Sequence, residues 1–358
     1  MMLKKLGMIS LLCVVIASLA ACGKSGEKAA SGTAKSELVE ASIDNASYIL
    51  TGEDDGVSEN KKHGLLAVTL KVKNVSDSDV TFLGSEDIKL YDGDKQFNPK
   101  RNVYSSEVDL EIDNSGDIGA GKVKTMTYVF DVEKDKTYEI GLHPNSMDHD
   151  QNQKSEEIKL KLDTKKYAES FDALNDPAKA LTAYIDTIYL GKDNSDYEKY
   201  VTADKAALQD KAKKNFKEKM DGIFTENNIS DSKLDKLYSS YQSFLAQKAK
   251  IEAKVSANAK GKAVVVLNYS AIPLSDLRGK VFDYKKEYWK NTDDYDPKKS
   301  EKYALSKFDT ILNKLDPKEG HYDLKVLMIQ KDGKWTVDNS DENSAEEISN
   351  VFAAGEVY

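Results

Sequence analysis

The sequence predicts a multidomain chain, with an all-β sandwich followed by an α+β domain in which helices pack on a curved antiparallel sheet. Over residues 38–163 apolar side chains alternate with polar ones, a period typical of strands with one buried face. From Asp176 the apolar spacing becomes that of amphipathic helices. Residues 23–163 carry 28 acidic and 18 basic side chains, whereas residues 164–358 carry 33 acidic and 32 basic ones. We therefore expect domains over residues 37–166 and 167–358 that fold independently.

Residues 1–21 have the order of charge, apolar core and small residues that is typical of a secretory signal peptide. Lys4 and Lys5 precede an apolar run over residues 6–19. This run is shorter than the roughly 20 apolar residues of a membrane-spanning helix. We therefore expect export of the chain and removal of residues 1–21.

The end of this segment, Leu19-Ala20-Ala21-Cys22-Gly23, resembles the lipobox of bacterial lipoproteins. The resemblance implies that the Cys22 thiol receives a diacylglyceryl group and that the chain is cut before it. Small residues at Ala20, Ala21 and Gly23 leave the cleaved backbone accessible. The alternative is an ordinary signal peptide with an incidental cysteine. A lipidated Cys22 places the protein on the extracellular face of the cell membrane, with the membrane as its first partner.

Residues 22–36 connect this anchor to the first domain. They are rich in Gly, Ser, Ala and Lys and lack periodic apolar residues, which is typical of a flexible tether. A tether of this length spans roughly 20 Å. Because the other cysteine, Cys13, lies in the signal segment, the mature domains are expected to be stable without disulfides.

The first domain is expected to contain about eight strands separated by turn-forming residues. The spacing of residues 68–74, 80–82, 88–92 and 121–132 resembles that of the immunoglobulin-like "immunoprotective extracellular" domain of Gram-positive lipoproteins. The resemblance covers residues 38–163 and implies an extracellular binding or spacer module without catalytic residues.

Four carboxylates at period two, Glu107, Asp109, Glu111 and Asp113, are expected on the solvent face of one strand. A cation site is the alternative, but Asn114 stands where a calcium loop needs its turn glycine.

His143 and the run Asp148-His149-Asp150 lie in a polar loop without a paired cluster of ligands. No metal site is therefore expected at His143 or at Asp148-His149-Asp150.

Residues 167–358 are expected to begin with helices and to end with a sheet. Asp176-Pro177 is a favoured helix start, and Gly191 ends that helix. Lys331-Asp332-Gly333 is typical of a hairpin turn. Further helices are expected over residues 204–224, 232–247, 275–290, 298–315 and 344–352, and strands over 251–255, 263–271, 324–329 and 334–337.

This plan resembles the cone-shaped, nuclear-transport-factor-like α+β folds, in which helices wrap a curved sheet around a pocket. Residues 183–189, 272–274 and 333–337 are also similar to an uncharacterised C-terminal domain of Gram-positive surface lipoproteins. That family has no settled activity, so the resemblance implies a fold and a location only.

Aromatic residues concentrate in the second half, which holds 14 of the 19 tyrosines and both tryptophans. Residues 277–303 combine several of them with Lys and Arg, and aromatic faces beside cations suit sugars, peptides or lipid headgroups. Tyr284, Tyr288 and Trp289 are the candidate ligand-binding residues. The alternative is packing against the core or along a helix face.

The chain has four histidines, no cysteine nucleophile after Cys22 and no recognisable catalytic motif. We therefore expect no enzyme activity, no catalytic residue and no cofactor. Neither half is basic, so nucleic-acid binding lacks its electrostatic requirement.

The sequence favours a lipid-anchored surface module that binds or senses a ligand such as a cell-wall glycan or a peptide. One alternative is a structural scaffold or an inhibitor that binds an envelope protein. A remoter alternative is a cell-wall hydrolase that works with a pair of carboxylates.

Overall fold

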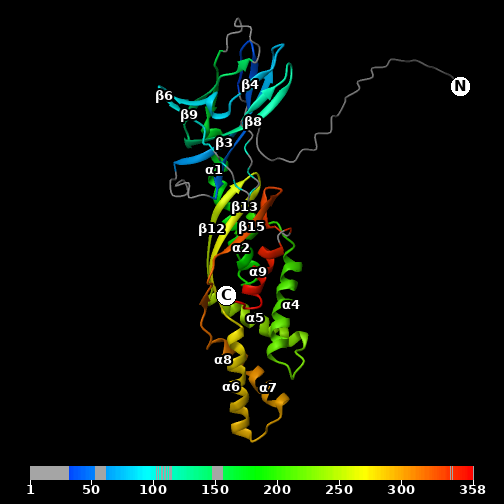
Figure 1. The fold of residues 1–358 in the computed structure, drawn as a ribbon. Coiled ribbons are helices and arrows are strands. Elements are labelled where there is room, and N and C mark those ends of the chain that lie inside the picture. The colour runs from blue at the N-terminus through cyan, green and yellow to red at the C-terminus, as the bar shows by residue number, and fades with distance from the viewer. Residues whose placement is uncertain are drawn as a thin grey trace, which may run out of the picture.

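The computed structural model describes residues 32–357 apart from 53–61, 102, 104, 106–107, 109, 111, 113–114, 147–155, 339 and 341. Within these residues a β-rich N-terminal domain is followed by an α+β domain, and the two lie end to end (Figure 1). The predicted order of a β domain and an α+β domain is confirmed.

The N-terminal domain buries its core between two groups of antiparallel strands. Alternate residues point into this core, as predicted: Leu66, Val68 and Leu70 are completely buried. The first group contains β1 (Thr33–Lys35), β2 (Val39–Thr51), β3 (His63–Asn74) and β8 (Val123–Glu133). The second contains the order β11-β9-β5-β6 and the short set β10-β4-β7: β4 (Val80–Phe82), β5 (Ile88–Asp92), β6 (Lys95–Phe97), β7 (Gly116–Ile118), β9 (Thr137–Leu142), β10 (Asn145–Ser146) and β11 (Ile158–Asp163).

The apolar residues of the predicted acidic strand are buried, although the described residues there form no ladder. Val108 and Leu110 are 0% and 2% exposed, yet the described part of this segment pairs only through an isolated bridge between Ser105 and Leu110. The four carboxylates that alternate with them lie outside the described residues. The burial of Val108 and Leu110 agrees with the predicted alternation, while Ile112 is only partly buried.

The helices of the second domain begin and end where local chemistry predicts. Pro177 occupies the first turn of its helix, and the Asp204 side chain accepts the N–H of Ala207. The elements are η2 (Thr164–Tyr167), α1 (Ala168–Asp172), η3 (Ala173–Asn175), α2 (Asp176–Ile188), α3 (Asp196–Tyr200), α4 (Lys205–Ile223), α5 (Asp231–Lys248), α6 (Ser275–Thr292), α7 (Pro297–Ser306), α8 (Phe308–Leu312) and α9 (Glu342–Phe352). The helix expected over residues 298–315 is in fact two, α7 and α8, which are separated at Lys307.

An antiparallel sheet supports these helices. Its strands are β12 (Lys250–Ala259), β13 (Lys262–Ala271), β14 (Lys318–Glu319), β15 (Leu324–Lys331) and β16 (Lys334–Val337). The predicted turn between β15 and β16 is confirmed, because Asp332 and Gly333 have φ values of 50° and 80°, as a tight hairpin requires. No helix among the described residues is long and apolar enough to cross a membrane.

One sheet continues across both domains. The end of β2 pairs with β12, with Thr51 opposite Ala257 and Leu50 opposite Asn258, so the strand order is β16-β15-β13-β12-β2-β3-β8. A second hydrophobic cluster lies at this junction and draws on both domains: Ile49, Leu65, Val108, Leu110, Val129, Ala257, Ala259 and Val264. We call this set the junction cluster.

The first helix after the β domain also packs on it. The Ser170 hydroxyl on α1 accepts the backbone N–H of Tyr48 at 3.1 Å. The Phe171 ring meets the Tyr48 ring edge-on, with centroids 5.0 Å apart. Residues allotted by sequence to the second domain therefore cover part of the first.

Candidate functional site

Two features of the C-terminal domain are suited to binding, and the first is a helical hairpin that contains the predicted aromatic residues. Helices α6 and α7 form this hairpin at the end of the described molecule opposite the N-terminal domain (Figure 1). Asp293 ends α6 in the left-handed conformation, and the Asp296 side chain caps the N-terminus of α7. The connection is therefore short and well defined.

The exposed part of the hairpin holds three aromatic rings, Phe282, Trp289 and Tyr295, which we call the aromatic cluster. The Trp289 ring stacks on Tyr295 at an interplanar angle of 29° and meets Phe282 edge-on, both at centroid distances of 6.2 Å. Phe282 is 48% exposed and Tyr295 is 70% exposed. The indole Nε1–H of Trp289 is buried and has no hydrogen-bond partner among the described residues.

Tyr284 and Tyr288 lie elsewhere on the same hairpin, along the line where α6 meets α7. Their ring centroids are 6.5 Å and 5.7 Å from that of Tyr303 on α7. The Tyr303 hydroxyl donates to Glu287 at 2.6 Å, which raises the pKa of Tyr303 above its usual range. The structure therefore separates the three predicted residues: Trp289 joins an exposed cluster, whereas Tyr284 and Tyr288 pack the two helices together.

The buried carboxylate of Glu301 joins the hairpin to the rest of the domain. Glu301 is 1% exposed, and its Oε1 accepts the backbone N–H groups of Glu226 and Asn227 at 3.0 and 2.9 Å. The Asn227 amide donates to the same oxygen at 3.1 Å. The Lys285 Nζ lies 4.0 Å from Oε2. A single side chain on α7 thus satisfies donors in the α4–α5 connection.

Replacing Glu301 with alanine is expected to destabilise the domain by about 2 kcal/mol. The reason is that the N–H groups of Glu226 and Asn227 then lose the charged oxygen that accepts their hydrogen bonds. Glu301→Gln is the matched variant, since it keeps one acceptor oxygen, and we expect it to recover much of the loss. Urea unfolding followed by tryptophan fluorescence measures both. An alanine variant as stable as the unsubstituted protein would contradict a structural role for this carboxylate.

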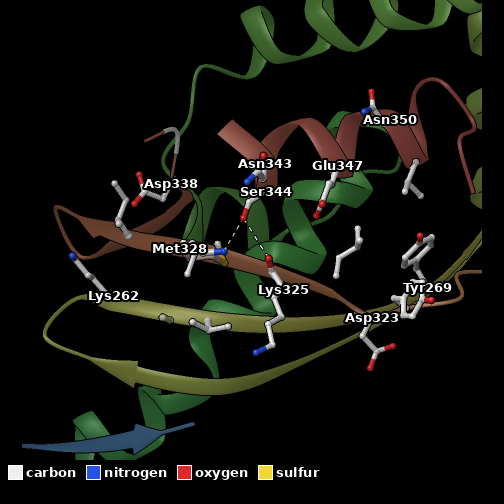
Figure 2. Close-up of a pocket in the computed structure, with 17 residues that line it drawn as sticks. Lys262, Tyr269, Asp323, Lys325, Met328, Asp338, Asn343, Ser344, Glu347 and Asn350 are labelled. Carbon is white, nitrogen blue, oxygen red and sulfur yellow. Dashed lines mark hydrogen bonds between the residues drawn. The ribbon is translucent and has the colours of Figure 1, made fainter. Parts of the chain in front are cut away.

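The second feature is a pocket of about 760 Å³ between α9 and β15. Figure 2 shows helix α9 above the strand, with polar side chains from both elements around the space between them. We call it the α9–β15 pocket. Its walls are formed by Lys262, Ala263, Val264, Tyr269, Tyr322, Asp323, Leu324, Lys325, Leu327, Met328, Ile329, Asp338, Asn343, Ser344, Glu347, Asn350 and Val351.

Ser344 holds α9 against the strand. Its buried hydroxyl accepts the backbone N–H of Leu327 at 3.2 Å and donates to the carbonyl of Lys325 at 3.4 Å, as the dashed lines in Figure 2 show. The hydrogen-bonded pairing of β15 with β16 begins only at Met328. Ser344 therefore satisfies backbone groups of β15 that precede this pairing, the Leu327 N–H and the Lys325 carbonyl. This contact fixes the position of the first turns of α9 over the pocket.

Three carboxylates and two lysines line the pocket. Asp323 accepts a hydrogen bond from Asn268 at 3.0 Å, and Asp338 accepts from the Ser340 backbone and hydroxyl. Glu347 is exposed and has no hydrogen bond or salt bridge among the described residues. Burial, and to a lesser degree the nearby Glu347 charge, raises the pKa of Tyr269.

The remaining sequence predictions concern the lipidated cysteine and the two possible metal positions, most of which lie outside the described residues. Cys22 and its flanking residues, Leu19, Ala20, Ala21 and Gly23, lie outside the described residues. The Asp148-His149-Asp150 run lies outside them as well, while His143 is exposed and donates its backbone N–H to Asp87. Within the described part of the chain, no group of three or more metal-ligating side chains is found.

The α9–β15 pocket was missed because its residues come from four separate stretches of sequence. Glu347 and Asn343 lie one turn apart on a helix whose polar side chains resemble any solvated face. Asp323 and Asp338 flank strands that were predicted, but their proximity to α9 depends on tertiary packing. The polar residues on the pocket side of α9 were the only available signal.

Comparison with known families covers both domains. Residues 33–153 match the "Domain of unknown function (DUF4352)". Residues 167–353, more than half of the chain, match the "Domain of unknown function (DUF5105)". The chain belongs to the DUF5105 family. Both the aromatic cluster and the α9–β15 pocket lie within this DUF5105 region.

A full-length relative shares the two-domain organisation of this DUF5105 protein. The uncharacterized lipoprotein YcdA of Bacillus subtilis (strain 168) is 30% identical over an alignment of 354 residues, which covers 96% of this chain and 97% of YcdA. A crystal structure of the ycdA lipoprotein from Bacillus subtilis subsp. subtilis str. 168 is similar with a TM-score of 0.64 and 27% identity. That alignment covers 90% of this chain and 98% of the other.

Proposed function

We propose that this protein is a lipid-anchored binding module of the outer cell surface, which binds a glycan or a peptide through the aromatic cluster. The lipobox-like sequence at Cys22 and a full-length lipoprotein relative support the anchor. The role we propose is binding without catalysis, because the cluster offers ring faces, the Trp289 N–H and the Tyr295 hydroxyl but no paired nucleophile and base. Its ligand is uncharged or zwitterionic, in keeping with the nearly balanced charge of the C-terminal half.

The observation that carries this proposal is an exposed set of three rings on a projecting hairpin, in which Trp289 contacts both Phe282 and Tyr295. Phe282 and Tyr295 expose about half or more of their surface. Lys286 Nζ lies 4.4 Å from the centroid of the Phe282 ring and one face of Tyr295 stacks on Trp289, so a ligand can reach the remaining exposed parts of these rings. Stacking each ring on a sugar or peptide group contributes about 0.5–1.5 kcal/mol beyond burial of its area. Several rings together are therefore needed for useful affinity.

The indole N–H of Trp289 adds a reason for a polar ligand. A buried donor without a partner costs about 1–3 kcal/mol, and the Trp289 donor is such a group among the described residues. A sugar or peptide oxygen that enters beside Tyr295 would accept this hydrogen bond. Binding would then remove the free-energy cost of the unsatisfied Trp289 donor in the unliganded hairpin.

We test the proposal with soluble peptidoglycan fragments and tryptophan fluorescence. Trp335 is 4% exposed, so a change on ligand addition reports mainly on Trp289. Trp289→Ala should weaken binding at least tenfold, measured by calorimetry because the variant loses the fluorophore. Its free energy of unfolding should fall by less than about 1 kcal/mol, since the lost contacts lie at the surface.

Phe97→Ala is the matched control, because Phe97 is a 43% exposed aromatic residue on β6 of the other domain. It should bind fragments normally. Equal binding by Trp289→Ala and the unsubstituted protein would contradict the proposal. If no fragment or peptide binds at all, the same exposed rings favour the alternative of a scaffold or inhibitor that binds an envelope protein.

A further inference from the structure

We propose that the α9–β15 pocket is a second binding site, which takes a short zwitterionic peptide with its amino group at Glu347. The pocket and the aromatic cluster are formed by different elements, so this site is distinct from the one proposed above. Its volume of about 760 Å³ lies within the range of roughly 300–1,000 Å³ that is usual for small-ligand sites. The space accommodates a peptide of a few residues.

Glu347 is the anchor for the amino group. In Figure 2 its side chain extends from α9 toward β15, across the space between the two elements. Because it has no hydrogen bond or salt bridge among the described residues, its charge is not neutralised by a neighbouring cation. An ammonium group that enters the pocket meets this carboxylate without displacing another ion pair.

The apolar part of the wall is suited to a side chain of the peptide. Leu324, Leu327 and Ile329 on β15 are only partly buried where they line the pocket, and Val351 on α9 adds a buried apolar surface. An aliphatic side chain placed there removes apolar surface from water, which is the main source of affinity in such sites.

The rest of the lining matches the other end of a peptide. Asn343 lies one turn before Glu347 on the same face of α9, where its amide and the nearby positive end of the helix favour a carboxylate. Lys262 and Lys325 also line the pocket. Three carboxylates against two lysines give a slight negative excess, so the amino group is the stronger anchor and anionic ligands are disfavoured.

The probe is the tripeptide Ala-Leu-Ala, compared with its N-acetylated and C-amidated forms by isothermal titration calorimetry on the full mature chain. We expect one site per chain. Acetylation, which removes the ammonium charge, should weaken binding at least tenfold, and amidation should weaken it less. Binding that is undetectable at millimolar peptide, or equal for the free and acetylated forms, would overturn the assignment.

Glu347→Gln should also weaken the free peptide at least tenfold. Glu346→Gln is its matched control: the neighbouring carboxylate lies in a different depression, between α9 and α4, and its loss should leave binding unchanged. Asn343→Trp provides a second variant, because a large ring at this exposed position fills the pocket and should abolish binding. Glu347→Gln and Asn343→Trp variants that both bind like the unsubstituted protein would refute the site.

The same titration separates this proposal from the one on the aromatic cluster. Trp289→Ala should bind Ala-Leu-Ala normally, since Trp289 is not in the pocket wall. Loss of tripeptide binding in Trp289→Ala would instead assign the tripeptide to the hairpin and overturn the pocket proposal.

Discussion

Replacing Cys22 with serine is expected to move the protein from the membrane fraction to the soluble fraction. Within the lipobox-like sequence, the Cys22 thiol is the only nucleophile that can take the diacylglyceryl group. Two acyl chains anchor stably because each buried CH₂ contributes about 0.8 kcal/mol. No helix in the described residues can replace them as a membrane span.

The measurement is fractionation of cells after a carbonate wash, followed by immunoblotting. Cys13→Ser is the matched control, because Cys13 lies within the apolar run of the signal segment and should leave anchoring intact. Retention of Cys22→Ser in the washed membranes would contradict lipid attachment at this residue.

Anchoring at Cys22 has a geometric consequence for the candidate sites. The sequence predicts a flexible tether over residues 22–36 between the anchor and the N-terminal domain. The structure corrects the end of this range, because Thr33–Lys35 form β1 and pair with β2. The aromatic cluster lies at the opposite end of the described molecule (Figure 1). We infer that the β domain holds the hairpin away from its point of attachment, where wall polymers and secreted peptides are accessible.

Much of the fold follows from local sequence patterns. Period-two alternation identified β3, because Leu66, Val68 and Leu70 all face one core. A strand that is buried on one face has apolar residues at every second position. Helix α5 was equally clear, since its buried side chains repeat at helical spacing. The Asp332-Gly333 turn was predictable because few residues adopt two successive positive φ values.

The candidate sites depend on information that such patterns lack. Trp289 was identified as a probe, but its neighbour across the turn, Tyr295, and the edge contact with Phe282 require the geometry of the hairpin. Tyr284 and Tyr288 share the composition of the cluster but pack against α7 instead. Helical phase and the path of the next helix decide between these outcomes, and neither is visible in residue counts.

The domain junction was also hidden from sequence. The changes in charge and periodicity between Asp163 and Asp176 locate a change of architecture, and they favoured independent folding. Independent folding stays a prediction, and the structure adds that pairing of β2 with β12 connects the two domains through one sheet. Strand pairing between such distant segments leaves no local signal, because each strand shows the same alternation whichever partner it has.

We therefore expect Leu110→Ala to destabilise both domains. Leu110 is 2% exposed and belongs to the junction cluster, whose members come from both domains. Truncating a buried leucine to alanine costs about 2–5 kcal/mol, including the cavity that remains. Part of that cost should fall on the C-terminal domain, because the cluster also covers Ala257, Ala259 and Val264 on β12 and β13.

Tryptophan fluorescence measures this coupling, since Trp289 and Trp335 both lie in the C-terminal domain. The matched control is Leu160→Ala, which truncates an equally buried leucine on β11, a strand paired with β9 within the N-terminal domain. Both variants should lower the stability of the β domain as measured by circular dichroism. Leu110→Ala should lower the fluorescence-detected transition more than Leu160→Ala, because Leu110 belongs to the small junction cluster with Ala257, Ala259 and Val264, whereas Leu160 lies on a strand that pairs within the N-terminal domain. If the two substitutions shift that transition equally, the junction cluster does not couple the domains.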